Sequence, residues 1–180
     1  MNRVRQLTDE AIEEIEKYNS CQSAYYILKT LSEGAETLCK EKEVKYDYTV
    51  DNLIIMSLYT YEDVTKARLF VTSFIIYDLL AKKYTIQNPL FYFRWNKRYF
   101  VYSPRIESHL SYLSREGFVK NRKKYSLTEY GKKEGETSLA TLNKETLSKI
   151  QESVSTLKRI ETMKQTKVFL KKYLMGYREE

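Results

Sequence analysis

The alternation of apolar and polar positions predicts a chain built mainly from helices. Only two prolines and five glycines interrupt the 180 residues, so long helices are expected. Apolar residues between positions 64 and 80 fall on most sides of a helix, which indicates burial from several directions. We expect this helix to begin at Thr60, with Glu62 and Asp63 in its first turn.

The first third of the chain also has helical patterning. Thr8 precedes acidic residues in the manner of a helix start, and a second helix is predicted from about Ser20 to Lys40. Residues 44–51 are consistent with either a short strand or a connector. Asp51 or Asn52 is then expected to cap a helix that extends through Leu58.

Aromatic residues dominate positions 90–102 around a polar centre, which favours a hairpin, or a strand with an extended loop. The step Ser103-Pro104 should start the next helix, because serine caps helix starts and proline tolerates the first helical position. Gly117 suits a left-handed cap, so this helix is predicted to end at Glu116.

Two short strands joined by a basic loop should follow. Residues 118–120 and 125–127 have strand character, and Arg122, Lys123 and Lys124 lie between them. Thr128 is expected to cap another helix. The predicted order is therefore helix, strand, basic loop, strand, helix.

This segment resembles winged-helix regulators of the PadR and MarR type over about 30 residues. The resemblance is carried by the patterns Leu110-x-x-Leu113-x-x-x-Gly117-Phe118-Val119 and Tyr125-x-Leu127-Thr128-x-x-Gly131. It implies a mainly α fold with a small β-hairpin wing, a winged helix-turn-helix flanked by N- and C-terminal helices. A weaker similarity to Panacea-type antitoxin-related domains includes Phe91, Phe93 and Tyr102-Ser103-Pro104, although Phe100-Val101 occupies the place where those families commonly have Gly-Pro.

The resemblance implies that the helix from Pro104 to Glu116 lies in the major groove of duplex DNA. Its side chains that are not needed for packing would meet bases or phosphates: Arg105, Ser108, His109, Tyr112 and Arg115. The wing residues Arg122, Lys123 and Lys124 would contact the backbone or the minor groove. His109 has no evident partner in the sequence, so we expect an exposed polar position.

The charge balance agrees with a polyanionic partner. The net charge is +7 and the isoelectric point about 9.2, which makes nucleic acid a natural ligand. Aromatic and basic residues alternate between positions 91 and 100, as in platforms for single-stranded nucleic acid, although packing in the core is the stronger interpretation of those rings. Arg94, Lys97 and Arg98 are predicted phosphate contacts in either case.

The C-terminal third should contain two more helices. Asn143 is expected to start the first, whose apolar side chains form a short seam at Leu147, Ile150, Val154 and Leu157. The seam would pack on the protein's own first helices or form a homodimer interface, and we favour the dimer. Residues 164–177 form a basic amphipathic segment that offers a solvated face, or phosphate or membrane-surface contacts through Lys167, Lys171 and Lys172.

These patterns divide the chain into residues 1–59, a winged-helix domain at 60–136 and a C-terminal segment at 137–180. No catalytic motif, metal cluster or phosphate-binding glycine loop is evident, so we expect no enzyme, no cofactor and no metal. Cys21 and Cys39 are expected to be small buried residues of a reduced, cytoplasmic protein without a membrane span.

Two functions follow from these predictions. The first is a transcriptional regulator that binds double-stranded DNA as a homodimer. The alternative is a winged-helix protein-interaction module, such as an antitoxin-like or assembly protein, without sequence-specific DNA binding.

Overall fold

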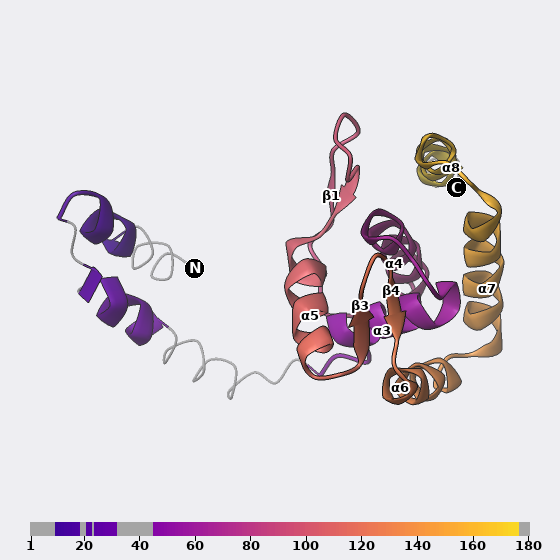
Figure 1. The fold of residues 1–180 in the computed structure, drawn as a ribbon, viewed down its shortest axis with the longest axis horizontal. Helices are drawn as coiled ribbons and strands as arrows, with labels where there is room; N and C mark the ends of the chain where they lie inside the picture. The colour runs from indigo at the N-terminus through magenta and orange to yellow at the C-terminus, as the bar shows by residue number, and fades with distance from the viewer. Residues whose placement is uncertain (1–9, 19–20, 23, 32–44, 177–180) are drawn as a thin grey trace. The chain divides into compact units, whose positions relative to one another are not determined.

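The computed structural model describes residues 10–18, 21–22, 24–31 and 45–176 (Figure 1). It divides the chain into two units, Met1–Lys45 and Tyr46–Glu180. In the first unit, residues 10–16, 21–22 and 24–31 are helical, in agreement with the predicted helices. Thr8, Cys39 and the end of the second predicted helix lie outside the described residues. Cys21 is exposed, so the expectation that it is buried is wrong.

The second unit begins with α3 (Val50–Tyr61), which starts at a different residue from the one predicted. Thr49 is the cap, and its hydroxyl accepts the backbone N–H of Asn52. The Asn52 side chain in turn accepts the Thr49 backbone N–H at 2.9 Å, which completes a reciprocal capping box. Residues 45–49 form a connector whose one ladder contact is a bridge between Tyr48 and Ile86.

Thr60 does not start the next helix, contrary to the prediction. Its hydroxyl donates to the carbonyl of Met56 at 2.8 Å within the last turns of α3. The chain turns at Glu62, whose φ is +61°, and α4 (Lys66–Leu80) begins after Thr65. Glu62 and Asp63 therefore lie in the connection between two helices and not in the first turn of α4.

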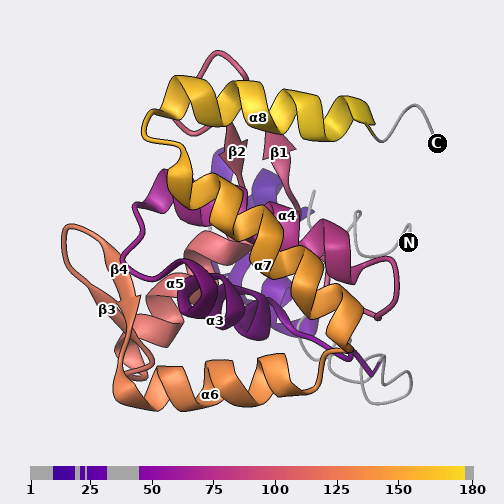
Figure 2. The ribbon, with the colours of Figure 1, turned by 90° about the vertical axis from the view of Figure 1, so that its right-hand side faces the viewer.

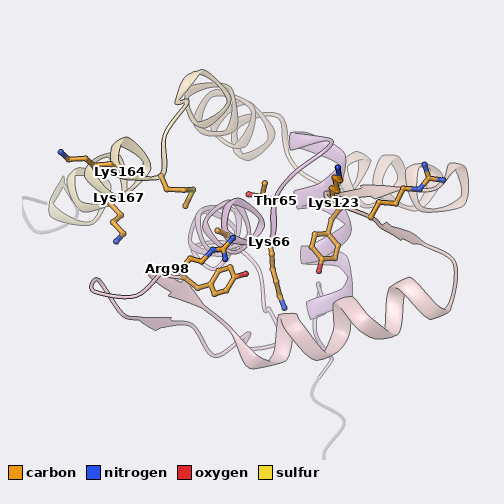
Figure 3. Close-up of a pocket in the computed structure, with 11 residues that line it drawn as sticks. Thr65, Lys66, Arg98, Lys123, Lys164 and Lys167 are labelled. Atoms are coloured by element: carbon orange, nitrogen blue, oxygen red, sulfur yellow. The ribbon is translucent and has the colours of Figure 1, made fainter.

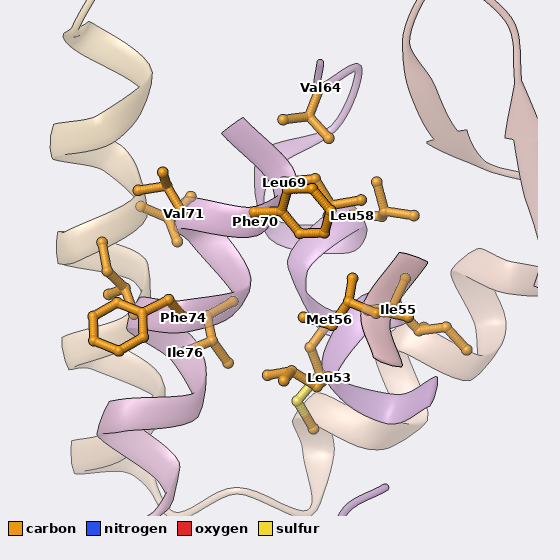
Figure 4. Close-up of a cluster of buried hydrophobic side chains, with 14 of the residues drawn as sticks. Leu53, Ile55, Met56, Leu58, Val64, Leu69, Phe70, Val71, Phe74 and Ile76 are labelled. Atoms are coloured by element: carbon orange, nitrogen blue, oxygen red, sulfur yellow. The ribbon is translucent and has the colours of Figure 1, made fainter. Parts of the chain in front are cut away.

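Helices α3 and α4 form the centre of the hydrophobic core. Leu53, Ile54, Phe70 and Ile75 are fully buried, and side chains from the two helices pack against one another (Figure 4). The burial of α4 on most of its circumference confirms the prediction from its apolar pattern. The predicted boundary at 59/60 falls inside α3, so the structure differs from the three-part division.

Hairpin β1–β2 follows α4. Strands β1 (Tyr92–Phe93) and β2 (Val101–Tyr102) pair antiparallel, which confirms the predicted hairpin. Its rings pack on α4 and on each other: the ring centroid of Phe74 lies 5.4 Å from that of Phe91 and 4.9 Å from that of Phe93, while Trp95 stacks on Phe100 at 5.9 Å. These contacts favour the core interpretation for Phe91, Trp95 and Phe100, whereas Tyr92 and Phe93 are exposed.

Helix α5 (Pro104–Arg115) begins at the predicted position and ends one residue before the predicted end, with Glu116 as its C-cap. Ser103 Oγ accepts the backbone N–H of Ile106 at 3.0 Å, and Pro104 occupies the first turn. Gly117 has a φ of +79°, the left-handed conformation that most residues avoid. The interpretation of this segment from local sequence signals is confirmed.

The wing is an antiparallel pair, β3 (Val119–Asn121) and β4 (Tyr125–Leu127). Thr128 caps α6 (Glu129–Ala140) by accepting the backbone N–H of Gly131 at 3.1 Å. Val64 bridges to Tyr125 through two backbone hydrogen bonds of 3.0 and 2.8 Å, and so adds an edge to the wing. The β-hairpin wing is thus joined to the connection between α3 and α4.

The elements follow in the order α3, Val64, α4, α5 and β3–β4, a mainly α arrangement with a small β-hairpin wing. A helix-turn-helix usually joins its two helices by a turn of about 3–4 residues. Here residues 81–103, including the β1–β2 hairpin, separate α4 from α5. The rings of this insertion pack on Phe74, which explains why the long connection is ordered.

Helices α7 (Lys144–Arg159) and α8 (Met163–Gly176) complete the unit (Figure 2). Asn143 caps α7 as predicted, through its side chain and the backbone N–H of Thr146. The apolar seam of α7 is internal: Ile150, Val154 and Leu157 are at most 3% exposed and belong to the same core as α3 and α4. These three side chains of the seam therefore pack within the chain, whereas we favoured a dimer interface for the seam, and Leu147 is partly buried.

Helix α8 lies beside the β1–β2 hairpin. Lys167 Nζ donates to the carbonyl of Trp95 at 3.0 Å, and Tyr173 bonds to Asp78 of α4 at 2.7 Å. The second predicted domain boundary, 136/137, falls inside α6, and residues 46–176 belong to one unit. None of the described helices combines the length and the apolar character needed to cross a membrane.

Candidate nucleic-acid interface

Helix α5 has one buried and one exposed face. Ile106, Leu110 and Leu113 are at most 3% exposed and form part of the core. Ser108, Tyr112 and Arg115 are exposed, as the sequence predicts for a helix that packs by one stripe only. The Arg115 guanidinium carbon lies 5.7 Å from the ring centroid of Tyr112, near the end of the helix. The outward face therefore has side chains available for a partner.

Arg105 and His109 are held by neighbouring segments. Arg105 is exposed, and its Nη1 donates to the carbonyl of Asn88 at 2.7 Å. His109 Nδ1 lies 2.8 Å from Asp51 Oδ1, and both side chains are 32% exposed. The expectation of an exposed histidine without a partner is therefore wrong. The partner belongs to α3, 58 positions away in the sequence, and no local pattern connects the two residues.

The tip of the wing is exposed and basic. Arg122, Lys123 and Lys124 form the turn between β3 and β4, where the Arg122 backbone N–H donates to the Lys124 carbonyl at 3.2 Å. Among the described residues, no carboxylate forms an ion pair with these three side chains. The wing thus carries uncompensated positive charge, as predicted.

Beside the wing is a concave site that we call the basic hollow, with a volume of about 670 Å³ (Figure 3). Four segments far apart in the sequence border it: the start of α4, the turn of the β1–β2 hairpin, the wing and the start of α8. Its lining consists of six cationic residues and five others: Lys66, Arg98, Arg122, Lys123, Lys164 and Lys167, with Thr65, Ala67, Tyr99, Tyr125 and Met163. No carboxylate belongs to this lining.

Comparisons with protein-family models, with curated proteins and with solved structures find no match.

One carboxylate lies at the edge of the basic hollow. Glu107, in the first turn of α5, bonds to Lys66 Nζ and accepts the hydroxyl of Tyr102 at 2.7 Å. These two bonds, from Lys66 first and then Tyr102, lower the pKa of Glu107. Burial opposes the charged form of Lys66, but its bond to Glu107 and the attraction between them outweigh this effect and raise the pKa of Lys66. Both groups are charged at neutral pH.

The other cations of the basic hollow have little electrostatic compensation. Lys167 donates to a backbone carbonyl, and its Nζ lies 5.3 Å from the ring centroid of Phe100. Arg98 lies over the ring of the adjacent Tyr99 at 5.8 Å. Within the part of the chain that the structure describes, no ion pair engages Arg98 or Lys164. An anion that entered here would meet a field of one sign.

The structure brings together only some of the predicted contact residues. Arg98, Arg122 and Lys123 line the basic hollow, while Lys124 is exposed next to it on the wing. Lys97 is exposed in the turn of the β1–β2 hairpin but does not belong to the lining. The predicted residues therefore fall into a group at the hollow and a separate group on α5, while Arg94 and Lys97 belong to neither.

Arg94 has a different environment from the other predicted hairpin cations. Its guanidinium carbon lies 5.8 Å from the ring centroid of Tyr102, whose hydroxyl bonds to Glu107. The residue is exposed and does not line the basic hollow.

Sequence reasoning missed two cations of the basic hollow, Lys66 and Lys164. Lys66 was placed inside a helix expected to begin at Thr60, whereas it occupies the first position of α4. Lys164 lies in a basic segment, and no residue next to it in the sequence marks it as part of a site. Recognition of Thr65 as the true helix start would have revealed Lys66, but only tertiary structure brings Lys164 to the same site. Among the described residues, no group of three His, Cys, Asp or Glu side chains is arranged to hold a metal.

Proposed function

We propose that the unit formed by residues 46–176 binds duplex DNA, with α5 directed to the major groove and the wing to the phosphate backbone. One observation carries the proposal. Arg122 and Lys123 of the wing border the same hollow as Lys66, and Lys66 bonds to Glu107 in the first turn of α5. The basic wing and the start of the exposed helix are therefore neighbours that a single polyanion would meet together.

The exposed side chains suggest a division of labour. Ser108, Tyr112 and Arg115 project from the outer face of α5 and are suited to contact base edges. Arg105 is exposed at the start of the helix, although its bond to the Asn88 carbonyl would have to be shared or exchanged with a guanine. Lys123 and Lys124 form no ion pair with a carboxylate among the described residues and would supply affinity without sequence information.

The salt dependence of binding tests the proposal. For duplex DNA, the logarithm of the binding constant falls with the logarithm of salt concentration by roughly 0.9 for each phosphate neutralised. Replacement of two wing cations in Lys123→Ala/Lys124→Ala should therefore flatten the slope by about 2 units. Fluorescence anisotropy with a labelled duplex at several salt concentrations measures this slope.

A charge-matched variant controls for net charge. Lys133→Ala/Lys158→Ala removes two exposed lysines of α6 and α7 that do not belong to the turn of the wing or to the lining of the hollow, and should keep the parent's slope. If the wing variant and this control give the same slope as the parent, the wing does not contact the backbone and the proposal fails. Arg105→Ala should leave the slope nearly unchanged but reduce the preference for a selected site over a random duplex.

We further propose that the protein acts in the cytoplasm as a transcriptional regulator. It would bind DNA as a homodimer, at two half-sites about one helical turn apart. Because Ile150, Val154 and Leu157 of the α7 seam are buried within the chain, a dimer would have to form largely through another surface. Light scattering of the protein with a selected duplex distinguishes one bound chain from two. A duplex bound by one chain would contradict the homodimer.

A further inference from the structure

The basic hollow has the size and chemistry of a ligand site. Its volume of about 670 Å³ lies within the range of roughly 300–1,000 Å³ that is typical of small-molecule sites. Cationic side chains make up six of its eleven lining residues, and the remainder include the rings of Tyr99 and Tyr125. A site of this composition favours a ligand with several negative charges.

The positions of the cations indicate an extended ligand. Figure 3 shows Lys164 and Lys167 on one side of the hollow and Lys123 on the other, with Lys66 between them. A single phosphate ion offers one centre of negative charge to cations that come from four segments. A chain of linked phosphate groups can place successive charges near α8, near the start of α4 and near the wing.

Uncompensated charge is the energetic reason to expect such a ligand. Cations from four separate segments repel one another in this site, whose lining includes no carboxylate, and Glu107 at its edge is already engaged by Lys66 and Tyr102. The start of α4 also faces the hollow through Thr65 and Ala67, and the Thr65 side chain makes no capping bond. The cavity and its cations are the basis of the inference, and the helix start supplies further donors.

We propose that the basic hollow binds a chain of linked phosphate groups that spans from the wing to α8. Two sources have this chemistry: a free polyphosphate, such as the phosphate chain of a nucleoside triphosphate, and the phosphodiester backbone of a nucleic acid. The inference concerns the hollow alone, so it stands or fails separately from recognition of duplex DNA by α5.

Calorimetric titration at constant ionic strength tests the site directly. The probes are inorganic tripolyphosphate, ATP and, as a short anion, inorganic phosphate. The test variant is Arg98→Ala/Lys164→Ala, which removes two exposed cations without a described ion pair, and the control is Lys133→Ala/Lys158→Ala with the same net charge. Each hydrogen bond between a cation and a phosphate contributes substantially to the binding free energy. The test variant should therefore bind tripolyphosphate at least about tenfold more weakly than the parent.

The results separate a built site from general attraction. Two results together support the proposal. The test variant, but not the control, binds tripolyphosphate more weakly than the parent, and the parent binds inorganic phosphate more weakly than tripolyphosphate. Equal affinity of the parent and the test variant overturns the proposal, as does equal weakening in the test variant and the control. Circular dichroism of each variant verifies that a loss of binding is not a loss of fold.

Competition with a labelled duplex identifies the source of the phosphates. If tripolyphosphate displaces the duplex and the Arg98→Ala/Lys164→Ala variant loses duplex affinity, the nucleic-acid backbone occupies the hollow. If tripolyphosphate binds the hollow while duplex affinity is unaffected, the ligand is a free polyphosphate. If neither the parent nor any variant binds a duplex, the proposed function fails. The direct titration with tripolyphosphate still decides whether the hollow is a phosphate site.

Discussion

Replacement of Gly131 should loosen the base of the wing. A Cβ atom at this position would collide with the backbone carbonyl oxygen of Phe118 and lie 3.1 Å from Leu127 Cδ2. Both neighbours lie at the base of the wing, because Phe118 directly precedes β3 and Leu127 is the last residue of β4. Because a backbone oxygen cannot rotate away like the end of a side chain, α6 or the hairpin would have to shift.

The size of the effect follows from two opposing contributions. Overpacking of this kind typically costs about 1–3 kcal/mol. Alanine is favoured over glycine in a helix interior by up to about 1 kcal/mol, which offsets part of that cost. We therefore expect Gly131→Ala to lower the free energy of unfolding by roughly 1–2 kcal/mol, which corresponds to a decrease in Tm of about 2–8 °C for a chain of this size.

Urea unfolding followed by circular dichroism measures the change in free energy. Gly176→Ala is the matched control, because a Cβ at Gly176 has no atom within 4 Å and the residue is also helical. The control should be as stable as the parent or slightly more stable. A Gly131→Ala protein that equals or exceeds the parent in stability would refute the packing of α6 on the wing described above.

Two further predictions concern polar contacts. Bonds from Lys149 and Lys83 lower the pKa of Glu145 to about 2, so the stability that it supplies is present above about pH 4.5 and is lost as the pH falls toward 2. Glu145→Gln should accordingly reduce the loss of stability between pH 4.5 and 2 in urea titrations, and an unchanged loss would contradict the contact. His109 and Asp51 are both partly exposed, so a double-mutant cycle with alanine should give a coupling free energy above zero but below about 1 kcal/mol. Strictly additive effects of the two substitutions on the free energy of unfolding would argue against the bond between them.

Local signals in the sequence were sufficient to predict much of the fold. Several signals act within four residues of their own position. They are the side-chain caps of Ser103, Thr128 and Asn143, the ring of Pro104 in the first helical turn, and the left-handed conformation of Gly117. The wing was predicted for the same reason, because a short hairpin joins neighbouring segments. These predictions were confirmed because they require no knowledge of distant residues.

Features that depend on distant segments were missed or misassigned. The start of α4 was placed at Thr60 because the acids that follow it resemble a first turn, while the actual break is supported by the bridge from Val64 to Tyr125. His109 has its partner 58 positions away. The seam of α7 has the spacing of a dimer interface, but spacing alone does not distinguish a partner chain from the chain's own core.

The candidate site shows the same limit. Sequence reasoning found Arg98, Arg122 and Lys123 as cations of two separate basic loops. Their common position at the basic hollow results from the packing of α8 beside the β1–β2 hairpin and from the bridge between the wing and the connection before α4. Lys66 and Lys164 are brought to the same hollow by these contacts.

The central claim is that the wing and α5 face one polyanion together. Hydrogen–deuterium exchange of the protein with and without a saturating duplex tests it most directly, at peptide resolution. We predict slower exchange in peptides that cover residues 104–116 and 119–127, with little change in residues 144–159 of α7. Slower exchange confined to α7, or no change in either the helix or the wing when the duplex is bound, would contradict the account.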